Sequence, residues 1–308
     1  MSYTRGCEGN SSSGTRHTPE MEIAFRMVDV FTDRPLAGNQ LCVVPDPPPG
    51  LDQALMQGLA QEIGFSETTF VSEAAGDRYA MRIFTPDTEL PFAGHPSLGT
   101  AFVLAAEGRI TSPATQVIGA GEFLMEVDVA EGRARMRQAA PHFGREAPAI
   151  ATLAKAVGLT ERDLPEDLWP RVVSTGLGHL IVAVRDVDAV TRARPDPDAI
   201  EAILDDLGAD GLYLFAAPED GRARARMFAP GVGVIEDPAT GSAAGPLGAY
   251  LADAGRAGMP GRLLIRQGEE LGRPSELCVD VVPNGESFEV WVEGGVAIVG
   301  RGAFELPD

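Results

Sequence analysis

Arg82-Ile83-Phe84-Thr85-Pro86 opens the stretch that decides the fold, which continues as Phe92-Ala93-Gly94-His95-Pro96-Ser97-Leu98-Gly99-Thr100-Ala101. A second copy reads Arg226-Met227-Phe228-Ala229-Pro230 and then Asp237-Pro238-Ala239-Thr240-Gly241-Ser242-Ala243-Ala244-Gly245-Pro246. In each copy an Arg-x-Phe-x-Pro strand end leads through a loop to a glycine and a polar residue, and small and apolar residues follow. We therefore predict a duplicated strand, loop and helix, with the two loops facing one another across a cleft.

The sequence around each copy follows one plan. Alternating apolar and polar residues predict several short strands in each half, and helices are expected at about 51–63, 148–157 and 197–207. The helices that follow the two copies, at about 95–107 and 242–254, are apolar nearly all the way round, which is typical of buried helices. We predict an α+β fold of two pseudo-symmetric lobes, each a curled mixed or antiparallel sheet around a central buried helix.

The chain of 308 residues is long enough for two lobes of ordinary size. We place the first lobe at residues 21–140 and the second at 141–308, because the strand pattern is interrupted at Ala139-Ala140-Pro141-His142-Phe143-Gly144. The last strand is left free to pack back on the first lobe. Residues 1–20 include a Ser- and Gly-rich segment without apolar periodicity, so a disordered leader is expected there.

The composition excludes several classes of partner. The formal net charge is -20, and Lys155 is the only lysine. Because phosphate and anionic membrane surfaces need clustered cations, we expect no nucleic-acid or membrane partner. The three cysteines and four histidines lack the spacing of a metal site, and no apolar run reaches the length of a membrane-spanning helix. We therefore expect a cytoplasmic protein without a metal.

The Gly94-His95 and Gly241-Ser242 steps are candidate substrate-binding sites. Each lies where a buried helix is expected to begin, and a helix start presents unpaired backbone N–H groups and a partial positive charge. Two such starts facing one another would bind a small-molecule carboxylate without Lys or Arg, and glycine lets the ligand approach the backbone. In either copy alone these residues could simply cap a helix. The duplication favours the ligand site.

Glu67 is the candidate general acid/base. It stands in Gly64-Phe65-Ser66-Glu67-Thr68-Thr69-Phe70, after a helix end and at the start of a strand. Aromatic neighbours would remove water from its carboxylate and raise its pKa toward neutrality, where the group can take up and return a proton. The alternative is an exposed glutamate at the start of a strand.

His95 and Asp237 are the other catalytic candidates. His95 lies at an expected helix start opposite Ser242, although a lone histidine is more often a satisfied loop residue. Asp237 precedes a proline and could simply initiate a turn. Its counterpart in the first copy is placed at about Glu89, and its neighbour Glu236 is expected to be solvated.

Four ordered motifs resemble the phenazine-biosynthesis PhzF family over residues 22–306. They are Asp29-x-Phe31-Thr32-x-x-Pro35-Leu36-x-Gly38-Asn39, Ser66-Glu67-Thr68-Thr69-Phe70, Arg82-x-Phe84-Thr85-Pro86-x-x-Glu89-Leu90-Pro91-Phe92-Ala93-Gly94-His95-Pro96 and Glu236-Asp237-Pro238-Ala239-Thr240-Gly241-Ser242-Ala243-Ala244. The resemblance implies a diaminopimelate epimerase-like fold, a homodimer and no cofactor. The best known member of the family isomerises trans-2,3-dihydro-3-hydroxyanthranilate.

The resemblance also implies roles for individual residues. Glu67 falls on the family's general acid/base, while His95, Asp237 and Ser242 fall on residues that hold substrate or assist proton movement. The substrate-binding residues that we predict are Asn39, Gly94, Gly241 and Ser242. One departure is Gln40, which stands where the family usually has a proline and adds a side-chain amide near the cleft.

Three functions remain to be separated. The related epimerases and proline-type racemases use two cysteines, one at each helix start, and the corresponding positions here are Ala93 and Thr240. Without that pair of thiols, a single carboxylate can still carry a proton from one carbon to another on the same face of a substrate. We therefore favour an isomerase that shifts a proton within a small, cyclic or unsaturated carboxylate. The alternatives are an epimerase or racemase with non-thiol bases and a non-catalytic protein that binds small acids.

Overall fold

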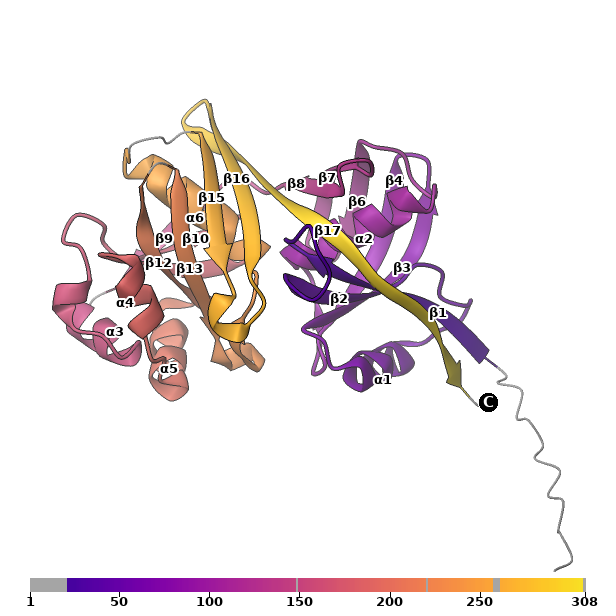
Figure 1. The fold of residues 1–308 in the computed structure, drawn as a ribbon, viewed down its shortest axis with the longest axis horizontal. Helices are drawn as coiled ribbons and strands as arrows, with labels where there is room; N and C mark the ends of the chain where they lie inside the picture. Colours follow the sequence, from indigo (N-terminus) through magenta and orange to yellow (C-terminus); the bar gives the residue numbers. More distant parts are fainter. Residues whose placement is uncertain (1–20, 148, 220, 257–260, 307–308) are drawn as a thin grey trace, which may run out of the picture.

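The computed structural model describes residues 21–306 except 148, 220 and 257–260, so the expected leader lies outside the described residues. The protein is α+β, with many strands and few helices (Figure 1). All of the described strands belong to one hydrogen-bonded network. Figure 1 shows them in two groups, with β17 (Ser287–Leu306) running from one group to the other. Among the described helices, none has both the length and the apolar character to cross a membrane.

The first group contains eight strands and two helices. Its strands are β1 (Met21–Val30), β2 (Asn39–Val44), β3 (Glu67–Ala75), β4 (Arg78–Phe84), β5 (Glu89–Leu90), β6 (Ala114–Ile118), β7 (Gly121–Asp128) and β8 (Arg133–Arg137). Its helices are α1 (Gln53–Ile63) and α2 (Gly94–Ala106). The pairs β2–β3 and β4–β6 are parallel, whereas β1–β2, β3–β4, β4–β5, β6–β7 and β7–β8 are antiparallel.

The second group contains the remaining elements. Its strands before β17 are β9 (His142–Glu146), β10 (Arg171–Ser174), β11 (Gly178–Val184), β12 (Gly211–Glu219), β13 (Arg222–Ala229), β14 (Val234–Asp237), β15 (Arg262–Gln267) and β16 (Ser275–Asn284). Its helices are α3 (Ile150–Ala156), α4 (Val187–Arg192), α5 (Pro197–Leu207) and α6 (Gly241–Asp253). Short 3-10 turns lie at Glu161–Asp163, Pro230–Val232 and Glu269–Leu271.

Strand pairing in the second group repeats that of the first. The pairs β11–β12 and β13–β15 are parallel, while β10–β11, β12–β13, β13–β14, β15–β16 and β16–β17 are antiparallel. The register repeats as well, because Arg82 pairs with Phe70 and Arg226 pairs with Leu214. Both pairs are offset by 144 residues, which is also the offset of the two sequence copies. The strand β17 joins the groups, since it pairs with β16, β8 and β1.

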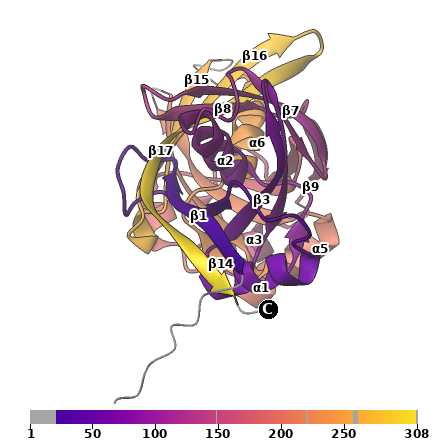
Figure 2. The ribbon, with the colours of Figure 1, turned by 90° about the vertical axis from the view of Figure 1, so that its right-hand side faces the viewer.

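The helices α2 and α6 lie among the strands of their groups. Every residue of α2 from Gly94 to Leu104 is buried, as is every residue of α6 from Gly241 to Leu251. The view in Figure 2 looks onto α2 with α6 behind it and strands on several sides. Glycines allow the close packing, because a β-carbon added at Gly99 or Gly248 would lie 2.5 Å from a Leu41 methyl or 2.7 Å from a Val279 methyl.

The first turns of α2 and α6 meet each other. A β-carbon added at Gly94 would lie 2.8 Å from the backbone nitrogen of Ser242, closer than real β-carbons approach other atoms. A β-carbon at Gly241 would lie 2.9 Å from the ring of Phe31 and 3.5 Å from the α-carbon of Gly94. The two helix starts can therefore come this close only because Gly94 has no side chain, while Gly241 leaves room for the ring of Phe31.

This contact predicts the effect of adding one methyl group. Gly94→Ala should lower the free energy of unfolding by about 1–3 kcal/mol, because the β-carbon has backbone rather than a flexible side chain in its way. The control is Gly58→Ala in α1, where nothing lies within 4 Å of an added β-carbon. This substitution should leave stability unchanged or raise it by up to about 1 kcal/mol. Urea denaturation measures both, and equal stability of the two variants would contradict the close contact.

Candidate active site

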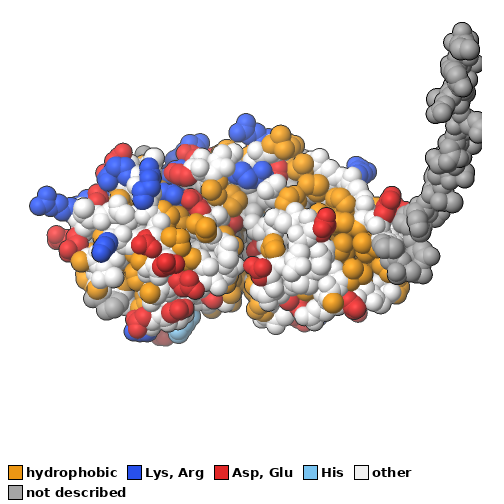
Figure 3. Space-filling model, turned by 90° about the horizontal axis from the view of Figure 1, so that it is seen from below, with side chains coloured by type: hydrophobic (Ala, Val, Ile, Leu, Met, Phe, Trp, Pro, Cys, Tyr) orange, Lys and Arg blue, Asp and Glu red, His pale blue; other side chains and the backbone are white. Residues whose placement is uncertain are grey.

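A cavity of about 130 Å³ lies at the meeting point of the two helix starts. Its lining includes six of the predicted site residues, Glu67, Gly94, His95, Asp237, Gly241 and Ser242. The apolar part of the wall comes from both halves of the chain and includes Leu90, Phe92, Leu177, Met227 and Val234. Since a protein cavity of about 150 Å³ holds benzene, this one has room for a single six-membered ring. In the view from below, a shallow groove separates the two halves and acidic side chains flank it (Figure 3).

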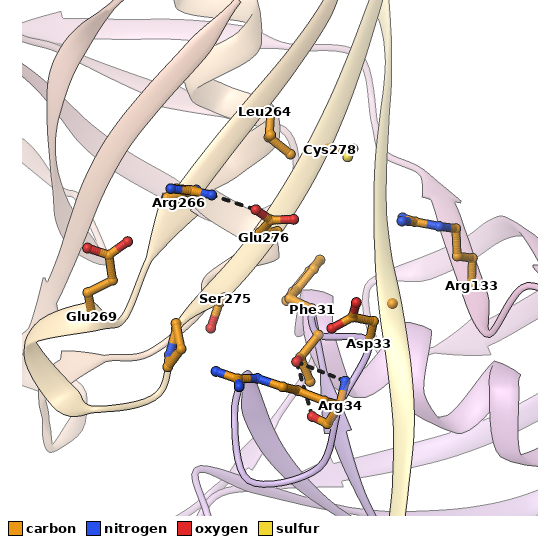
Figure 4. Close-up of a pocket in the computed structure, with 13 residues that line it drawn as sticks. Phe31, Asp33, Arg34, Arg133, Leu264, Arg266, Glu269, Ser275, Glu276 and Cys278 are labelled. Atoms are coloured by element: carbon orange, nitrogen blue, oxygen red, sulfur yellow. Dashed lines mark hydrogen bonds and ion pairs between the residues drawn. The ribbon is translucent and has the colours of Figure 1, made fainter.

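A larger cavity, of about 510 Å³, lies elsewhere between the halves (Figure 4). Its lining includes Arg266, which contacts Glu276 at 3.4 Å, and Arg133, which contacts Glu293 at 3.2 Å. None of the predicted catalytic residues lines it. Two of its three arginines are thus engaged by acids of the same chain, and the third, Arg34, is exposed. The smaller cavity is the stronger candidate because the predicted catalytic residues line it.

Glu67 is placed in the smaller cavity by the end of α1. The helix stops at Gly64, whose φ of 66° belongs to the left-handed region, and Glu67 then begins β3. Its Oε2 atom is buried and has no hydrogen-bond partner among the described residues. Burial, and second the nearby charge of Asp237, raise the pKa of Glu67 well above its ordinary value. The expected rise is therefore present, but its cause is burial and a second acid, not only aromatic neighbours.

His95 lies beside Glu67 in the first turn of α2. Its Nδ1 is 3.2 Å from the Asn39 side-chain nitrogen, which can only donate, so the ring hydrogen is assigned to Nε2. Nε2 lies 3.3 Å from both the Gln40 carbonyl oxygen and Oε2 of Glu67. Burial lowers the pKa of His95 to about 3. The Glu67–His95 contact therefore joins a neutral imidazole to the acid and is not an ion pair.

Asp237 reaches the cavity from the end of β14. Its Oδ1 accepts a hydrogen bond of 2.8 Å from Asn39, and its Oδ2 accepts one of 2.5 Å from the Thr240 hydroxyl. Burial raises the pKa of Asp237 to about 6, although these two hydrogen bonds work in the opposite direction. The cavity thus contains two acids, Glu67 and Asp237, that both hold protons more tightly than ordinary carboxyl groups.

Asn39 lies behind the cavity lining. It is 1% exposed, and besides His95 and Asp237 its side-chain nitrogen also contacts the Ala239 carbonyl at 3.0 Å. These three acceptors engage both of its amide hydrogens. Gln40, the residue that departs from the family pattern, supplies its backbone oxygen to His95, and its side chain is not part of the lining. In this arrangement Asn39 ties the histidine of the first half to the acid of the second.

The helix starts carry no side-chain caps. Ala93 and Thr240 are the N-cap residues of α2 and α6, and neither side chain bonds to the first turn. Among the described residues, the backbone N–H groups of Gly94 and Ser242 find no acceptor. The Ser242 hydroxyl instead lies 3.2 Å from Nε2 of His179, a histidine that no sequence motif marks. Capping therefore does not account for these residues, and the free N–H groups suit an anion.

Strand register corrects the expected symmetry of the acids. Arg82 pairs with Glu89 at 2.6 Å and Arg226 pairs with Glu236 at 2.8 Å, so the counterpart of Glu89 is Glu236 and not Asp237. Glu236 is also not solvated as expected, since its side chain is 12% exposed and both oxygens bind Arg226. The expected equivalence of Asp237 and Glu89 is wrong by one residue, because the loops of the two copies differ in length and only the pairing with β4 and β13 fixes the register.

Glu67 and Asp237 come from unrelated positions of the repeat. Leu90 pairs with Ile83 in the first half, and Asp237 pairs with Met227 in the second, so Asp237 stands where the first half has Leu90. Gly211 begins β12 as Glu67 begins β3, at the same offset of 144 residues as the paired strands. The position equivalent to Glu67 therefore has no side chain. Asp210, the third acid of the lining, accepts a hydrogen bond of 2.8 Å from the Gly178 backbone N–H.

The raised pKa values predict how stability depends on pH. The folded protein holds protons on Glu67 and Asp237 that the unfolded chain releases, so the stabilisation is complete below pH 4 and is lost as pH rises through 6 and beyond. Burial lowers the pKa of His95 and of His179, so these histidines make stability rise with pH up to about 6.5. Above about pH 6.5 they are neutral in both the folded and the unfolded chain and no longer contribute to the pH dependence.

Chemical denaturation between pH 6.5 and 8 therefore isolates the acids, because the buried Cys42 thiol, whose pKa is raised to about 12, adds its own dependence only nearer pH 9. The free energy of unfolding of the wild type should fall over this range, and that of Glu67→Gln should fall less. The matched control is Glu73→Gln, which changes an exposed acid on the same strand and should follow the wild type. Parallel curves for wild type and Glu67→Gln would show that Glu67 is not buried in its protonated form.

Comparison with known proteins gives one consistent result. The family described as phenazine biosynthesis-like protein matches residues 28–302. Trans-2,3-dihydro-3-hydroxyanthranilate isomerase of Pseudomonas fluorescens is 36% identical over 92% of this chain and 99% of its own. A PhzF-family phenazine biosynthesis protein of Bacillus anthracis has a similar structure, with a TM-score of 0.83 and 29% identity over 92% of this chain and 99% of its own.

The likeness of fold extends further than the likeness of sequence. A probable proline racemase from Agrobacterium radiobacter superposes with a TM-score of 0.64 over 91% of this chain and 92% of its own, at 15% identity. At this identity only the fold is comparable. The racemase-like fold agrees with the expected epimerase-like architecture at the level of fold class.

Proposed function

Because the chain belongs to the phenazine biosynthesis-like family, we propose that it is a cofactor-independent isomerase that moves a proton within a small carboxylate-bearing ring, with Glu67 as its one acid/base. Trans-2,3-dihydro-3-hydroxyanthranilate, on which the relative from Pseudomonas fluorescens acts, is the candidate substrate. The observation that carries the proposal is the buried, unpartnered Oε2 of Glu67 inside a cavity of one-ring size. A carboxyl group of raised pKa in contact with a bound ring can both accept and return a proton near neutral pH.

The chain supplies the parts that such a proton shift needs. Ionised Glu67 removes a proton from a ring carbon, the electron pair moves through the conjugated double bonds, and the same carboxylic acid protonates another carbon. The neutral His95, whose Nε2 lies 3.3 Å from Oε2 of Glu67, packs beside the carboxyl group without forming a hydrogen bond to it. Asp237 makes Glu67 a stronger base, since two nearby acids resist carrying two negative charges.

The helix starts bind the carboxylate of the substrate in this proposal. The unpaired N–H groups of Gly94 and Ser242 and the positive ends of α2 and α6 lie at one cavity, which attracts an anion without any Lys or Arg. This explains how a chain of net charge -20 could accept an acid. It also fixes the ring relative to Glu67, and such positioning is a large part of enzymatic rate enhancement.

The same proposal includes the organisation of the fold. Residues 21–140 and 141–308 form two lobes related by a pseudo-twofold axis, each a curled sheet around one central helix. Support comes from the repeated order, direction and register of strand pairing and from the complete burial of the first three turns of α2 and α6. Closure of the lobes around a bound acid would bring both helix starts onto it.

Inversion of a stereocentre by two opposed bases is less well supported. Ala93 and Thr240 occupy the N-cap positions of the two helices, and neither can form a thiolate. Of the cysteines in the described part of the chain, Cys42 and Cys278, neither lines the cavity. The position equivalent to Glu67 is Gly211, so a second carboxylate does not face the first in symmetric fashion.

Replacement of Glu67 tests the proposal. Glu67→Gln keeps the size and polarity of the side chain but removes the group that takes up and returns the proton. The kcat on trans-2,3-dihydro-3-hydroxyanthranilate should therefore fall by roughly two to four powers of ten. The affinity for anthranilate, an unreactive ring acid, should stay within about threefold of wild type, because the helix starts are untouched. Glu73→Gln is the control for an acid on the same strand outside the cavity. A Glu67→Gln enzyme with more than about half of the wild-type rate would assign the chemistry to another group.

A further inference from the structure

His179 is a buried histidine in the cavity wall that the mechanism above does not use. It lies near the start of β11, it is 2% exposed, and its Nε2 is 3.2 Å from the Ser242 hydroxyl oxygen. Ser242 belongs to the first turn of α6, where the carboxylate is proposed to bind. The imidazole thus contacts a group that faces the ligand.

The surroundings of the ring decide which nitrogen carries its hydrogen. Nδ1 of His179 is buried and has no hydrogen-bond partner among the described residues. Burial lowers the pKa of His179 to about 4, so the ring is neutral at neutral pH and carries a single N–H. A buried N–H without an acceptor is rarer and costlier than an unused acceptor nitrogen. The hydrogen therefore belongs on Nε2, which donates it to Ser242.

This donation determines what the serine can do. A hydroxyl oxygen that accepts a hydrogen bond from His179 still has its own hydrogen to give. Ser242 has no other side-chain partner among the described residues, and it lines the cavity. Its hydroxyl hydrogen is therefore available to an oxygen atom of a ligand.

Gly211 makes room for the imidazole. A β-carbon added at Gly211 would lie 3.3 Å from Nδ1 of His179 and 2.2 Å from the terminal methyl of Met227. In the first half the equivalent strand position holds the acid, Glu67. The second half thus has a glycine, Gly211, where the first half has the carboxyl group of Glu67. Beside this glycine the imidazole of His179 lines the cavity as a neutral hydrogen-bond donor.

We propose that His179 is a positioning residue that holds the Ser242 hydroxyl as a hydrogen-bond donor to the carboxylate of the substrate. The proposal rests on the carboxylate-binding part of the proposed function and not on the identity of the acid/base. It assigns the two walls of the cavity different tasks: the β3 side moves the proton, and the β11 side orients the substrate. His179 then acts on the ligand only through Ser242.

A double-mutant cycle on the binding of anthranilate tests this role. By calorimetry, His179→Leu should weaken binding about tenfold, as expected for one hydrogen bond to a charged group. The same substitution should cause no further loss when Ser242→Ala is already present. His179→Gln, whose side-chain N–H can take the place of Nε2–H, should recover most of the affinity. His142→Leu, the same change at an exposed histidine, serves as the control and should bind like wild type.

Two further measurements keep the test independent of the folding of one variant. Long-range ¹⁵N NMR of the wild-type histidine rings should show His179 as the Nε2–H tautomer between pH 6 and 8. Gly211→Ala would place a methyl group 3.3 Å from Nδ1 of His179 and in the position of the Met227 methyl group. It should displace these side chains and so also weaken the binding of anthranilate. The binding of anthranilamide, which lacks the charge, should change less than that of anthranilate in every variant.

The opposite results separate the two proposals. An Nδ1–H tautomer, or equal loss from His179→Leu with and without Ser242→Ala, would overturn the positioning role alone. Equal wild-type affinity for anthranilate and anthranilamide would show that the helix starts do not bind a carboxylate. That result would contradict both the proposed carboxylate site and the positioning role of His179. Loss of turnover in Glu67→Gln is unaffected by either outcome.

Discussion

The contact between the first turns of α2 and α6 is the constraint on which the rest of the site depends. Two helix starts bring two partial positive charges together, which is unfavourable unless negative or polar groups lie nearby. The contact is possible because Gly94 has no side chain, since a β-carbon there would lie 2.8 Å from the Ser242 nitrogen. The fold thus holds a set of unpaired N–H groups in a buried place, where they are of most use to an anion.

The two histidines around this contact are neutral. Burial lowers the pKa of His95 to about 3 and that of His179 to about 4, and it raises the pKa of Glu67 and Asp237 above their ordinary values. With neutral imidazoles, the site avoids the cost of burying isolated positive charges while it is empty. It also leaves the positive helix starts free to receive the charge of a ligand. A carboxyl group whose pKa is raised, as that of Glu67 is, holds its proton more tightly and is a stronger base toward the bound ring.

Much of the fold and of the site could be predicted from the sequence. The two Arg-x-Phe-x-Pro copies predicted a repeated unit, and the strand pairing repeats with the same offset. The glycine and polar pairs at the helix starts lie at one cavity, as do Glu67, His95 and Asp237. These predictions rest on local patterns that recur, and a duplication supplies the long-range information that a single copy lacks.

Other features depend on pairings that the sequence does not show. The loop lengths of the two copies differ, so sequence alone pairs Asp237 with Glu89, whereas strand register makes Asp237 the equivalent of Leu90. The place of Asn39 behind the lining depends on its hydrogen bonds to His95 and Asp237, which lie 56 and 198 residues away in the chain. The strand β9 (His142–Glu146) lies where the interrupted strand pattern predicts only a boundary between two lobes. His179 has no motif around it, and only its 3.2 Å contact with Ser242 identifies it.

The central claim is that one carboxyl group removes and returns the proton from one face of the substrate. Turnover of trans-2,3-dihydro-3-hydroxyanthranilate in deuterated water, with NMR and mass spectrometry of product and recovered substrate, tests it most directly. The account predicts at most about one deuteron in the product, partial retention of the substrate's own hydrogen, and recovered substrate of unchanged configuration. Rapid deuterium uptake into recovered substrate together with inversion at that carbon would show two opposed bases and contradict the account.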